Sequence, residues 1–138
     1  MRPIRPWTVL AWVLVVWLAS GAKSPLELAI WWAPGPRVIV VVMESAETTP
    51  QQGRLYTAMR ASATSGEWRI KGHEVFILDK DQRTADEKPA RWLTQWSQWQ
   101  QHRLPVLMIG TAAGRLLYVG PLPESIGEVQ HIVAQYGG

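Results

Sequence analysis

The sequence contains no cysteine among its 138 residues, and this absence excludes several kinds of chemistry. Without a thiol, the chain can form no disulfide, supply no thiolate nucleophile and bind no metal ion through sulfur. A thiol–disulfide oxidoreductase activity intrinsic to this chain is therefore excluded. A domain of this length can be stable on its hydrophobic core without covalent cross-links.

Concentrated positive charge is also missing. Arg2 and Arg5 precede the first apolar run, and removing them from the 14 Lys and Arg leaves 14 − 2 = 12 basic residues against 11 acidic ones. No run of Lys and Arg is longer than two residues. Nucleic-acid binding requires a basic face with aromatic side chains for base stacking. We therefore expect no nucleic-acid partner.

The N-terminus has the composition of a membrane-targeting segment. Two arginines are followed by an almost entirely apolar run from Trp7 to Ala19, and then by small residues up to Ala22. This order is typical of a signal peptide cleaved after Ala22. It also fits an uncleaved anchor, although residues 7–22 are short for a span of about 20 residues. Both interpretations leave the N-terminus in the cytoplasm and predict export, as a secreted or periplasmic protein or as a single-pass membrane protein.

A second apolar segment follows at residues 26–33 and ends at a Pro-Gly-Pro run. Its paired tryptophans suit either a short helix packed on the domain or an interfacial segment close to the bilayer. We therefore divide the chain into a signal peptide or membrane anchor (residues 1–22), a linker with a short apolar segment (23–36) and a folded domain (37–138).

Four β-strands are predicted in the folded domain. The β-branched run Val38–Met43 is typical of a strand covered on both faces, and Glu74–Leu78 is predicted as a second buried strand. Leu104–Gly110 and Arg115–Gly120, joined by a glycine-containing turn, predict a hairpin.

Three helices are predicted around these strands. The first begins near Pro50, a residue favoured at the first helical position, and ends at Ser65-Gly66. The second extends from about Pro89 to His102, and the third follows a capping box at Ser125–Glu128. The order strand–helix–strand–helix–strand–strand–helix predicts an α/β domain with a mixed four-stranded sheet flanked by helices. We expect the helical crossovers to join parallel neighbours and the hairpin to be antiparallel.

The predicted second helix has a tryptophan stripe. Trp92, Trp96 and Trp99 lie four and then three residues apart, which places them on one helix face. Such a stripe can form an exposed binding surface. Packing on the sheet is favoured, because helical spacing of apolar residues is typical of a buried face.

This order of elements, with Leu104-Pro105 at the head of the hairpin, resembles the thioredoxin family. The stretch Leu104–Leu122 is similar to the family's cis-proline strand, its glycine-containing turn and the strand before the last helix. The resemblance covers about residues 26–138. It implies a thioredoxin-like three-layer sandwich and a cis peptide bond between Leu104 and Pro105.

The resemblance also indicates a site. Aligned on Pro50, Thr48 and Gln51 stand in the two cysteine positions of the family's Cys-Gly-Pro-Cys loop, with Thr49 and Pro50 between them. Neither threonine nor glutamine can replace a redox thiol. What the resemblance still implies is a shallow groove between residues 48–51 and Leu104-Pro105, where a partner's backbone can pair through main-chain groups alone.

Thr48 has a simpler interpretation as well, because a threonine at this place can cap the helix that starts near Pro50, and we favour that role over ligand binding. Asp79 and Asp81 follow a strand, where an acidic pair can bind a cation. A solvated turn is the favoured interpretation of that pair.

Other catalytic and metal-binding patterns are missing from the sequence. His73, His102 and His131 lie far apart and without ligand spacing, so no metal site is expected. No phosphate-binding glycine loop, Gly-x-Ser-x-Gly motif or Ser/His/Asp set is visible. We therefore expect no cofactor and identify no catalytic residue.

The favoured hypothesis is a non-catalytic thioredoxin-like module on the outer side of the cytoplasmic membrane, which binds a protein or peptide. One alternative is a structural envelope protein whose function lies in its N-terminal anchor, with residues 7–22 in the membrane, and in the Trp31-Trp32 segment. Another is an enzyme of non-redox chemistry on the same scaffold. Because one fold hosts many functions, fold alone does not choose among them.

Overall fold

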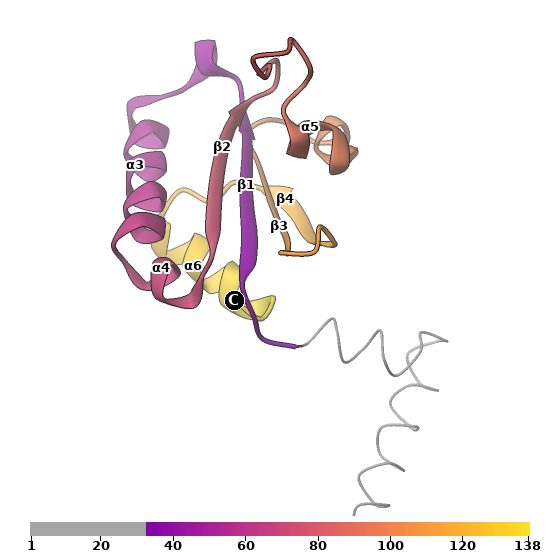
Figure 1. The fold of residues 1–138 in the computed structure, drawn as a ribbon. Helices are drawn as coiled ribbons and strands as arrows, with labels where there is room; N and C mark the ends of the chain where they lie inside the picture. The colour runs from indigo at the N-terminus through magenta and orange to yellow at the C-terminus, as the bar shows by residue number, and fades with distance from the viewer. Residues whose placement is uncertain (1–32) are drawn as a thin grey trace, which may run out of the picture. The chain divides into compact units, whose positions relative to one another are not determined.

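The computed structural model describes residues 33–138. The predicted signal peptide or anchor at residues 1–22 and nearly all of the apolar segment at 26–33 lie outside the described residues. Pro34–Gly138 form one compact unit, drawn in colour in Figure 1. Within the described part of the chain, no helix is both long enough and apolar enough to cross a membrane.

Strands and helices alternate along the chain until a final hairpin and helix (Figure 1). The strands are β1 (Arg37–Met43), β2 (Glu74–Asp79), β3 (Val106–Thr111) and β4 (Leu116–Pro121). The helices are α3 (Pro50–Thr64), α4 (Glu67–Lys71), α5 (Arg91–Gln95) and α6 (Ile126–Gln135), with 3-10 turns η1 (Ser45–Glu47) and η2 (Ser97–Gln101). The α/β class and the four predicted strands are confirmed.

The four strands form one mixed sheet in the order β2-β1-β3-β4. β1 is parallel to β2 and antiparallel to β3, and β3 and β4 form the predicted antiparallel hairpin. The prediction of parallel neighbours is therefore wrong for the second crossover. Val42, near the end of β1, pairs with both Leu78 and Val106. The connection from β2 to β3 therefore leaves and re-enters the sheet at the same end of the strands. For β3 to be parallel to β1, the helical part of this connection would have to carry the chain back to the opposite end of the strands, and it does not.

Position in the sheet decides how deeply each strand is buried. β1 lies between two strands, and residues 37–42 are buried on both faces, as its unbroken β-branched run predicts. β2 lies at the edge, and only Leu78 in it is fully buried, so the prediction of a second buried strand is wrong. An edge strand has a neighbour on one side only, which leaves much of its surface near solvent.

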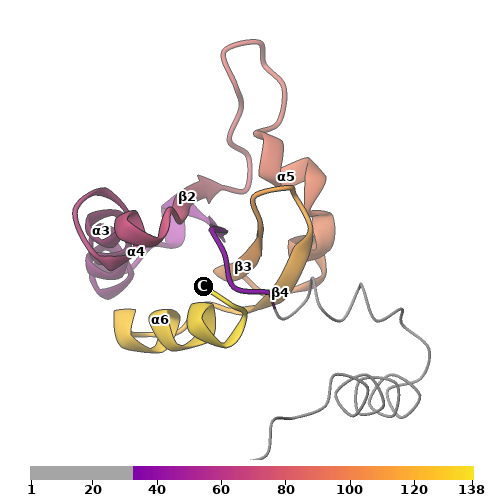
Figure 2. The ribbon, with the colours of Figure 1, turned by 60° about the horizontal axis from the view of Figure 1, so that its bottom comes forward.

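Helices cover both faces of the sheet, and each face has its own hydrophobic cluster. Ile39 and Val41 point toward α3, α4 and α6, where they pack with Met59, Trp68 and Val129. The alternate residues of β1 point to the other face. There they pack against side chains of α5 and its neighbours. Figure 2 shows α3 and α6 apart from α5 across the sheet.

The tryptophan stripe packs on the α5 face of the sheet, as predicted, but not from one helix. α5 ends at Gln95, and the 3-10 turn η2 carries Trp99 after a break at Trp96. Trp92 and Trp96 are buried, and Trp99 packs partly buried against the same cluster. The Trp96 indole N–H donates to the Gly114 carbonyl at 2.9 Å, and the Trp99 N–H donates to the Leu93 carbonyl at 2.9 Å. The prediction of one continuous helix from 89 to 102 is therefore wrong.

Helix α4 has no counterpart in the sequence-based prediction. It is only five residues long and places Trp68, 2% exposed, in the cluster shared with α3. Gly72 ends it with φ of 77°, a left-handed conformation that glycine adopts without steric cost. One buried side chain in a single turn gives no periodic pattern to detect.

Candidate functional site

The loop after β1 forms the floor of the candidate site, and the end of β2 holds it in place. An Asp79 carboxylate oxygen accepts from the Ser45 backbone N–H at 2.8 Å and from the Ser45 hydroxyl at 2.7 Å. Lys80 forms an ion pair with Glu44 at 2.8 Å, and its backbone N–H donates to the Met43 carbonyl at 2.9 Å. The hydrogen bond from the Ser45 hydroxyl is the main cause that lowers the pKa of Asp79.

Through these contacts, Asp79 holds the loop after β1 in position. Its other carboxylate oxygen accepts from the Asp81 backbone N–H at 2.9 Å, which closes a turn. Within residues 33–138, no group of three or more His, Asp or Glu residues is placed to hold a metal ion.

Thr49, and not Thr48, caps helix α3. The Thr49 hydroxyl accepts from the Gln52 backbone N–H at 3.2 Å, and the Gln52 side-chain oxygen accepts from the Thr49 N–H at 2.9 Å. This reciprocal pair is a capping box, followed by Pro50 at the start of the helix. The prediction that Thr48 caps the helix is wrong, because the helix begins at Pro50 and the capping residue is the one immediately before it.

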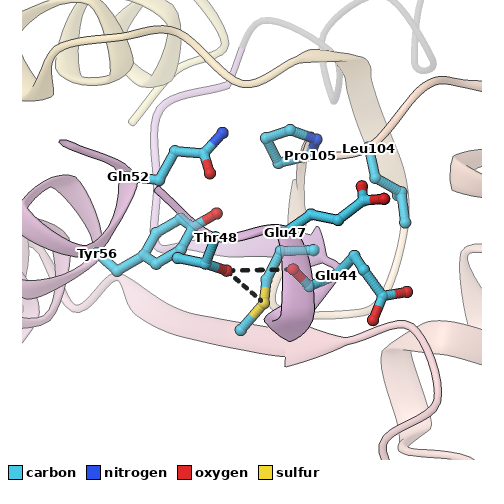
Figure 3. Close-up of a pocket in the computed structure, with 8 residues that line it drawn as sticks. Glu44, Glu47, Thr48, Gln52, Tyr56, Leu104 and Pro105 are labelled. Atoms are coloured by element: carbon cyan, nitrogen blue, oxygen red, sulfur yellow. Dashed lines mark hydrogen bonds between the residues drawn. The ribbon is translucent and has the colours of Figure 1, made fainter. Parts of the chain in front are cut away.

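Thr48 instead lies in the wall of a small hollow. Its hydroxyl donates to the Glu44 carbonyl at 3.2 Å and lies 3.7 Å from the Met43 sulfur (Figure 3). The side chain is thus tied to the preceding loop and not to the helix. Thr48 is also one of the residues that line this hollow.

The opposite wall comes from the segment before β3. The Leu104–Pro105 peptide bond is cis, the isomer that the resemblance implies. The Pro105 carbonyl accepts from the Leu122 N–H at 3.2 Å, which ties this segment to the end of β4. The backbone N–H and carbonyl of Leu104 have no hydrogen-bond partner among residues 33–138. They are a free donor and acceptor beside the groove.

Between these walls lies a cavity of about 60 Å³. It is lined by Met43, Glu44, Glu47 and Thr48 from the β1 side, Gln52 and Tyr56 from α3, and Leu104 and Pro105. Figure 3 shows Gln52 and Pro105 on one side of this hollow and Thr48 and Glu44 on the other, with Glu47 and the Tyr56 hydroxyl between them.

A second, wider hollow of about 300 Å³ continues the groove along the start of α3. Pro105 and Gln52 line both hollows, and Leu122, Pro123 and Glu124 form the far wall of the second. The two hollows adjoin at Gln52 and Pro105, and we call them together the α3–Pro105 groove.

The structure brings together most of the residues that the sequence indicated. Thr48, Leu104 and Pro105 line the smaller hollow, and Thr49 and Gln51 line the larger one. Pro50 lines neither, because its role is to begin α3.

Four polar residues of the smaller hollow were missed as site residues from the sequence: Glu44, Glu47, Gln52 and Tyr56. Gln52 was detectable in part, because a threonine three residues before a glutamine is the signature of a capping box. Tyr56 follows Leu55 in α3, and a tyrosine next to an apolar residue is ordinarily interpreted as core.

Tyr56 is the most unusual polar group of the groove. Its side chain is only 4% exposed, and its hydroxyl has no hydrogen-bond partner among the described residues. Burial raises the pKa of this phenol, so it is neutral at physiological pH and can both donate and accept. A buried hydroxyl without a partner costs free energy, and a bound group can remove that cost.

The three histidines remain separate. His73 is buried and its Nδ1 accepts from the Arg37 backbone N–H at 2.9 Å, whereas His102 and His131 are exposed. His73 lines a hollow of about 330 Å³ with Lys71, Gly35 and the residues around Gly137. That hollow shares no residue with the α3–Pro105 groove.

No protein-family model matches the chain, and no curated protein matches its sequence. Function is therefore inferred from the chemistry of the α3–Pro105 groove. The groove offers a free main-chain donor and acceptor at Leu104, an unpaired phenol at Tyr56, and carboxylates at Glu44 and Glu47. With no thiol in the chain, these groups can bind and orient a ligand but cannot exchange disulfides.

Proposed function

We propose that this protein is a non-catalytic binding module with a thioredoxin-like fold, which holds an extended segment of a protein or peptide in the α3–Pro105 groove. The free N–H and carbonyl of Leu104 carry this proposal. An extended segment can satisfy both groups with its own backbone, as when a strand is added to an edge.

The arrangement of the elements supports the thioredoxin-like assignment. The domain has a β-α-β-α-β-β-α order, apart from the single extra turn of α4, and its parallel pair of β2 and β1 lies next to an antiparallel hairpin. Helices lie on both faces of this sheet. The groove at Leu104-Pro105 and the start of α3 is the place where the resemblance expects a partner's backbone.

The walls of the groove suit a chain more than a small rigid ligand. Gln52 uses its side-chain oxygen in the capping box and leaves its amide N–H groups for a carbonyl of the bound segment. Leu55, Leu122 and Pro123 offer apolar contact along the wider hollow. Alternate side chains of an extended segment can enter the two hollows, while its main chain pairs with Leu104.

We further propose that residues 1–22 direct this domain out of the cytoplasm, as a cleaved signal peptide or as an anchor. The support is the order of arginines, apolar run and small residues. The intact mass of the protein from fractionated native cells tests this. A chain that starts at Met1 and stays in the cytoplasmic fraction would overturn it.

Peptide binding is tested with the full chain kept in solution by a nonionic detergent. Peptides of random sequence displayed on phage are selected against it, and a selected peptide is then made with an N-methyl group at each position in turn. We expect one N-methyl group to abolish binding and the neighbouring one to leave it intact, because successive N–H groups of a strand point to opposite sides. Hydrogen exchange of the Leu104 amide should slow in the complex.

The proposal would be overturned by a peptide that binds equally well at every methylated position without protecting the Leu104 amide. Failure of all peptides to bind a chain whose spectrum shows it to be folded would overturn it too.

A further inference from the structure

The smaller hollow of the α3–Pro105 groove has the size of a side-chain head group. A water molecule needs about 10–15 Å³ of such space, so a cavity of about 60 Å³ has room for roughly four waters. It can therefore hold a small polar group with one or two methylenes. It is too small for a ring with substituents.

The polar groups around this hollow are chiefly acceptors. Glu47 forms no ion pair within the described residues, and Glu44 forms one only with Lys80. The two carboxylates and the one lysine leave about one negative charge beside the cavity at neutral pH. The unpaired Tyr56 hydroxyl, buried and directed into the same space (Figure 3), supplies a further acceptor.

The rest of the wall is apolar. Met43, Leu104 and Pro105 face the hollow with carbon and sulfur atoms that cannot neutralise a charge but can contact a methylene stem. An apolar stem that ends in a charged head is the shape of a lysine side chain, which buries its carbon chain along apolar surface.

We propose that this hollow is a lysine subsite, in which the ε-ammonium group of the bound segment donates to the Tyr56 hydroxyl and to the carboxylate of Glu47. The inference rests on the proposed peptide binding and adds the chemical class of the side chain recognised. An ammonium has three donors and no acceptor, and so complements a site of acceptors.

Other head groups fit this hollow less well. A carboxylate or phosphate would meet Glu44 and Glu47, and Lys80, the one cation paired there, is already bound to Glu44. A guanidinium carries five donors in a planar fork, and a cavity of about 60 Å³ has less room for this fork than for a compact ammonium. The single hydroxyl of Tyr56 likewise suits one N–H donor of an ammonium.

The first experiment uses small probes with the full chain in detergent. N-acetyl-lysine methylamide is titrated while the amide signals of Thr48 and Leu104 are followed by NMR, beside the norleucine analogue, which has the same stem length without the charge. We expect saturable shifts with the lysine probe and none with the norleucine probe. The arginine analogue should bind more weakly than the lysine probe, and the shifts should shrink as salt is added.

The second experiment uses peptides selected for binding and two matched pairs of variants. Changing the subsite lysine of a peptide to norleucine should weaken binding about tenfold or more, because a hydrogen bond to a charged group is lost. Tyr56→Phe and Glu47→Gln should each remove most of the preference for lysine over norleucine. The controls Tyr118→Phe and Glu128→Gln make the same changes away from the groove and should leave the preference unaltered.

Glu47 is exposed, so its substitution is safe for folding even if Tyr56→Phe alters stability.

The outcomes of these experiments distinguish the lysine subsite from backbone pairing at Leu104. Peptides that pair with Leu104 but show no preference for lysine would overturn the lysine subsite alone. A lysine probe that binds with the expected variant pattern, together with peptides insensitive to N-methylation, would support the subsite and overturn backbone pairing. A norleucine probe that binds as well as the lysine probe would overturn the subsite.

Discussion

Gly110 in β3 shows how one residue sets the packing of the α5 face. The Trp96 ring lies where the side chain of any other residue at position 110 would be, and the Arg115 carbonyl is 2.6 Å from a β-carbon placed there. The wide indole can therefore reach the sheet, where its N–H also finds the Gly114 carbonyl. The absence of a side chain at this position is a packing requirement.

The substitution Gly110→Ala should therefore lower the free energy of unfolding by about 1–3 kcal/mol, the usual cost of overpacking a core. Urea denaturation of the full chain measures this. Gly53→Ala is the matched control, because a β-carbon at position 53 of helix α3 meets nothing within 4 Å. Alanine there should raise the free energy of unfolding by about 0.5–1 kcal/mol. Equal effects of the two substitutions would contradict this account of Gly110.

At the same scale, the sequence indicates which residues are apolar but not which polar groups remain unpaired. Leu55 and Met59 of α3 are four residues apart, the spacing of one helix face, and both are buried. Tyr56 is buried as well, and the lack of a partner for its hydroxyl follows only from the positions of Gln52, Thr48 and Leu104 around it. Unpaired groups depend on distances between segments far apart in the chain, which a one-dimensional pattern does not contain.

At the scale of elements, the capping residue of helix α3 fixes the point at which the helix begins. The first residues of α3 line the groove, so the cap also fixes the position of that wall. The Thr49 hydroxyl satisfies a backbone N–H of the first turn that has no partner within the helix. Thr48, one residue earlier, donates its hydroxyl to the Glu44 carbonyl and satisfies no N–H of the helix.

Thr49→Ala should therefore lower the free energy of unfolding by about 0.5–2 kcal/mol, the usual cost of removing a capping side chain. Thr48→Ala removes a hydroxyl of the same kind that caps nothing, and its effect should be clearly smaller. Chemical denaturation followed by circular dichroism compares the two. A larger loss from Thr48→Ala than from Thr49→Ala would show that the helix begins one residue earlier in solution.

Helices and strands were predictable where an apolar pattern continued along the chain, and not where that pattern was interrupted. β1 carries an unbroken apolar run, and it is buried on both faces as predicted. The helix predicted from Pro89 to His102 has the correct tryptophan spacing but breaks at Trp96, whose backbone at φ −116° and ψ 71° is not helical. Hydrogen bonds from the indole N–H groups of Trp96 and Trp99 to backbone carbonyls stabilise the interrupted helix. The spacing of apolar residues in the sequence does not indicate such hydrogen bonds.

For the molecule as a whole, the α/β class followed from the order of elements and the position of the groove from the family resemblance, whereas the direction of β3 was predicted wrongly. The resemblance to the thioredoxin family indicated the start of α3 and Leu104-Pro105 as the two sides of the groove, and both follow or precede strands that meet beside Val42 in the structure. The direction of β3 depends on where the chain returns after α5, which is set by packing of the tryptophans on β1. Tertiary packing, not local propensity, determines that choice.

His73 links the beginning and the end of the domain, and its protonation should affect the whole fold. It follows α4, and its Nδ1 accepts from the first residue of β1, Arg37, whose side-chain Nε donates to the Tyr136 carbonyl at 2.7 Å. Burial is the main cause that lowers the pKa of His73, and the charges of Lys71 and Arg37 lower it further, against a smaller opposing effect of Glu67. The folded protein therefore holds this imidazole neutral.

Above about pH 6.5, the usual pKa of histidine, His73 is neutral in both states and adds no pH dependence. As the pH falls below that value, the unfolded chain binds a proton that the folded chain does not, so the free energy of unfolding must decrease until the pH passes the lowered pKa of the folded state. Urea denaturation between pH 8 and pH 5 should show this loss. In His73→Asn, whose side-chain oxygen can still accept from Arg37 but cannot be protonated, the slope should become shallower. His102→Asn, at an exposed site, should keep the slope of the original chain. An unchanged slope in His73→Asn would mean that the imidazole takes up its proton without disturbing the contact between β1 and the end of α4.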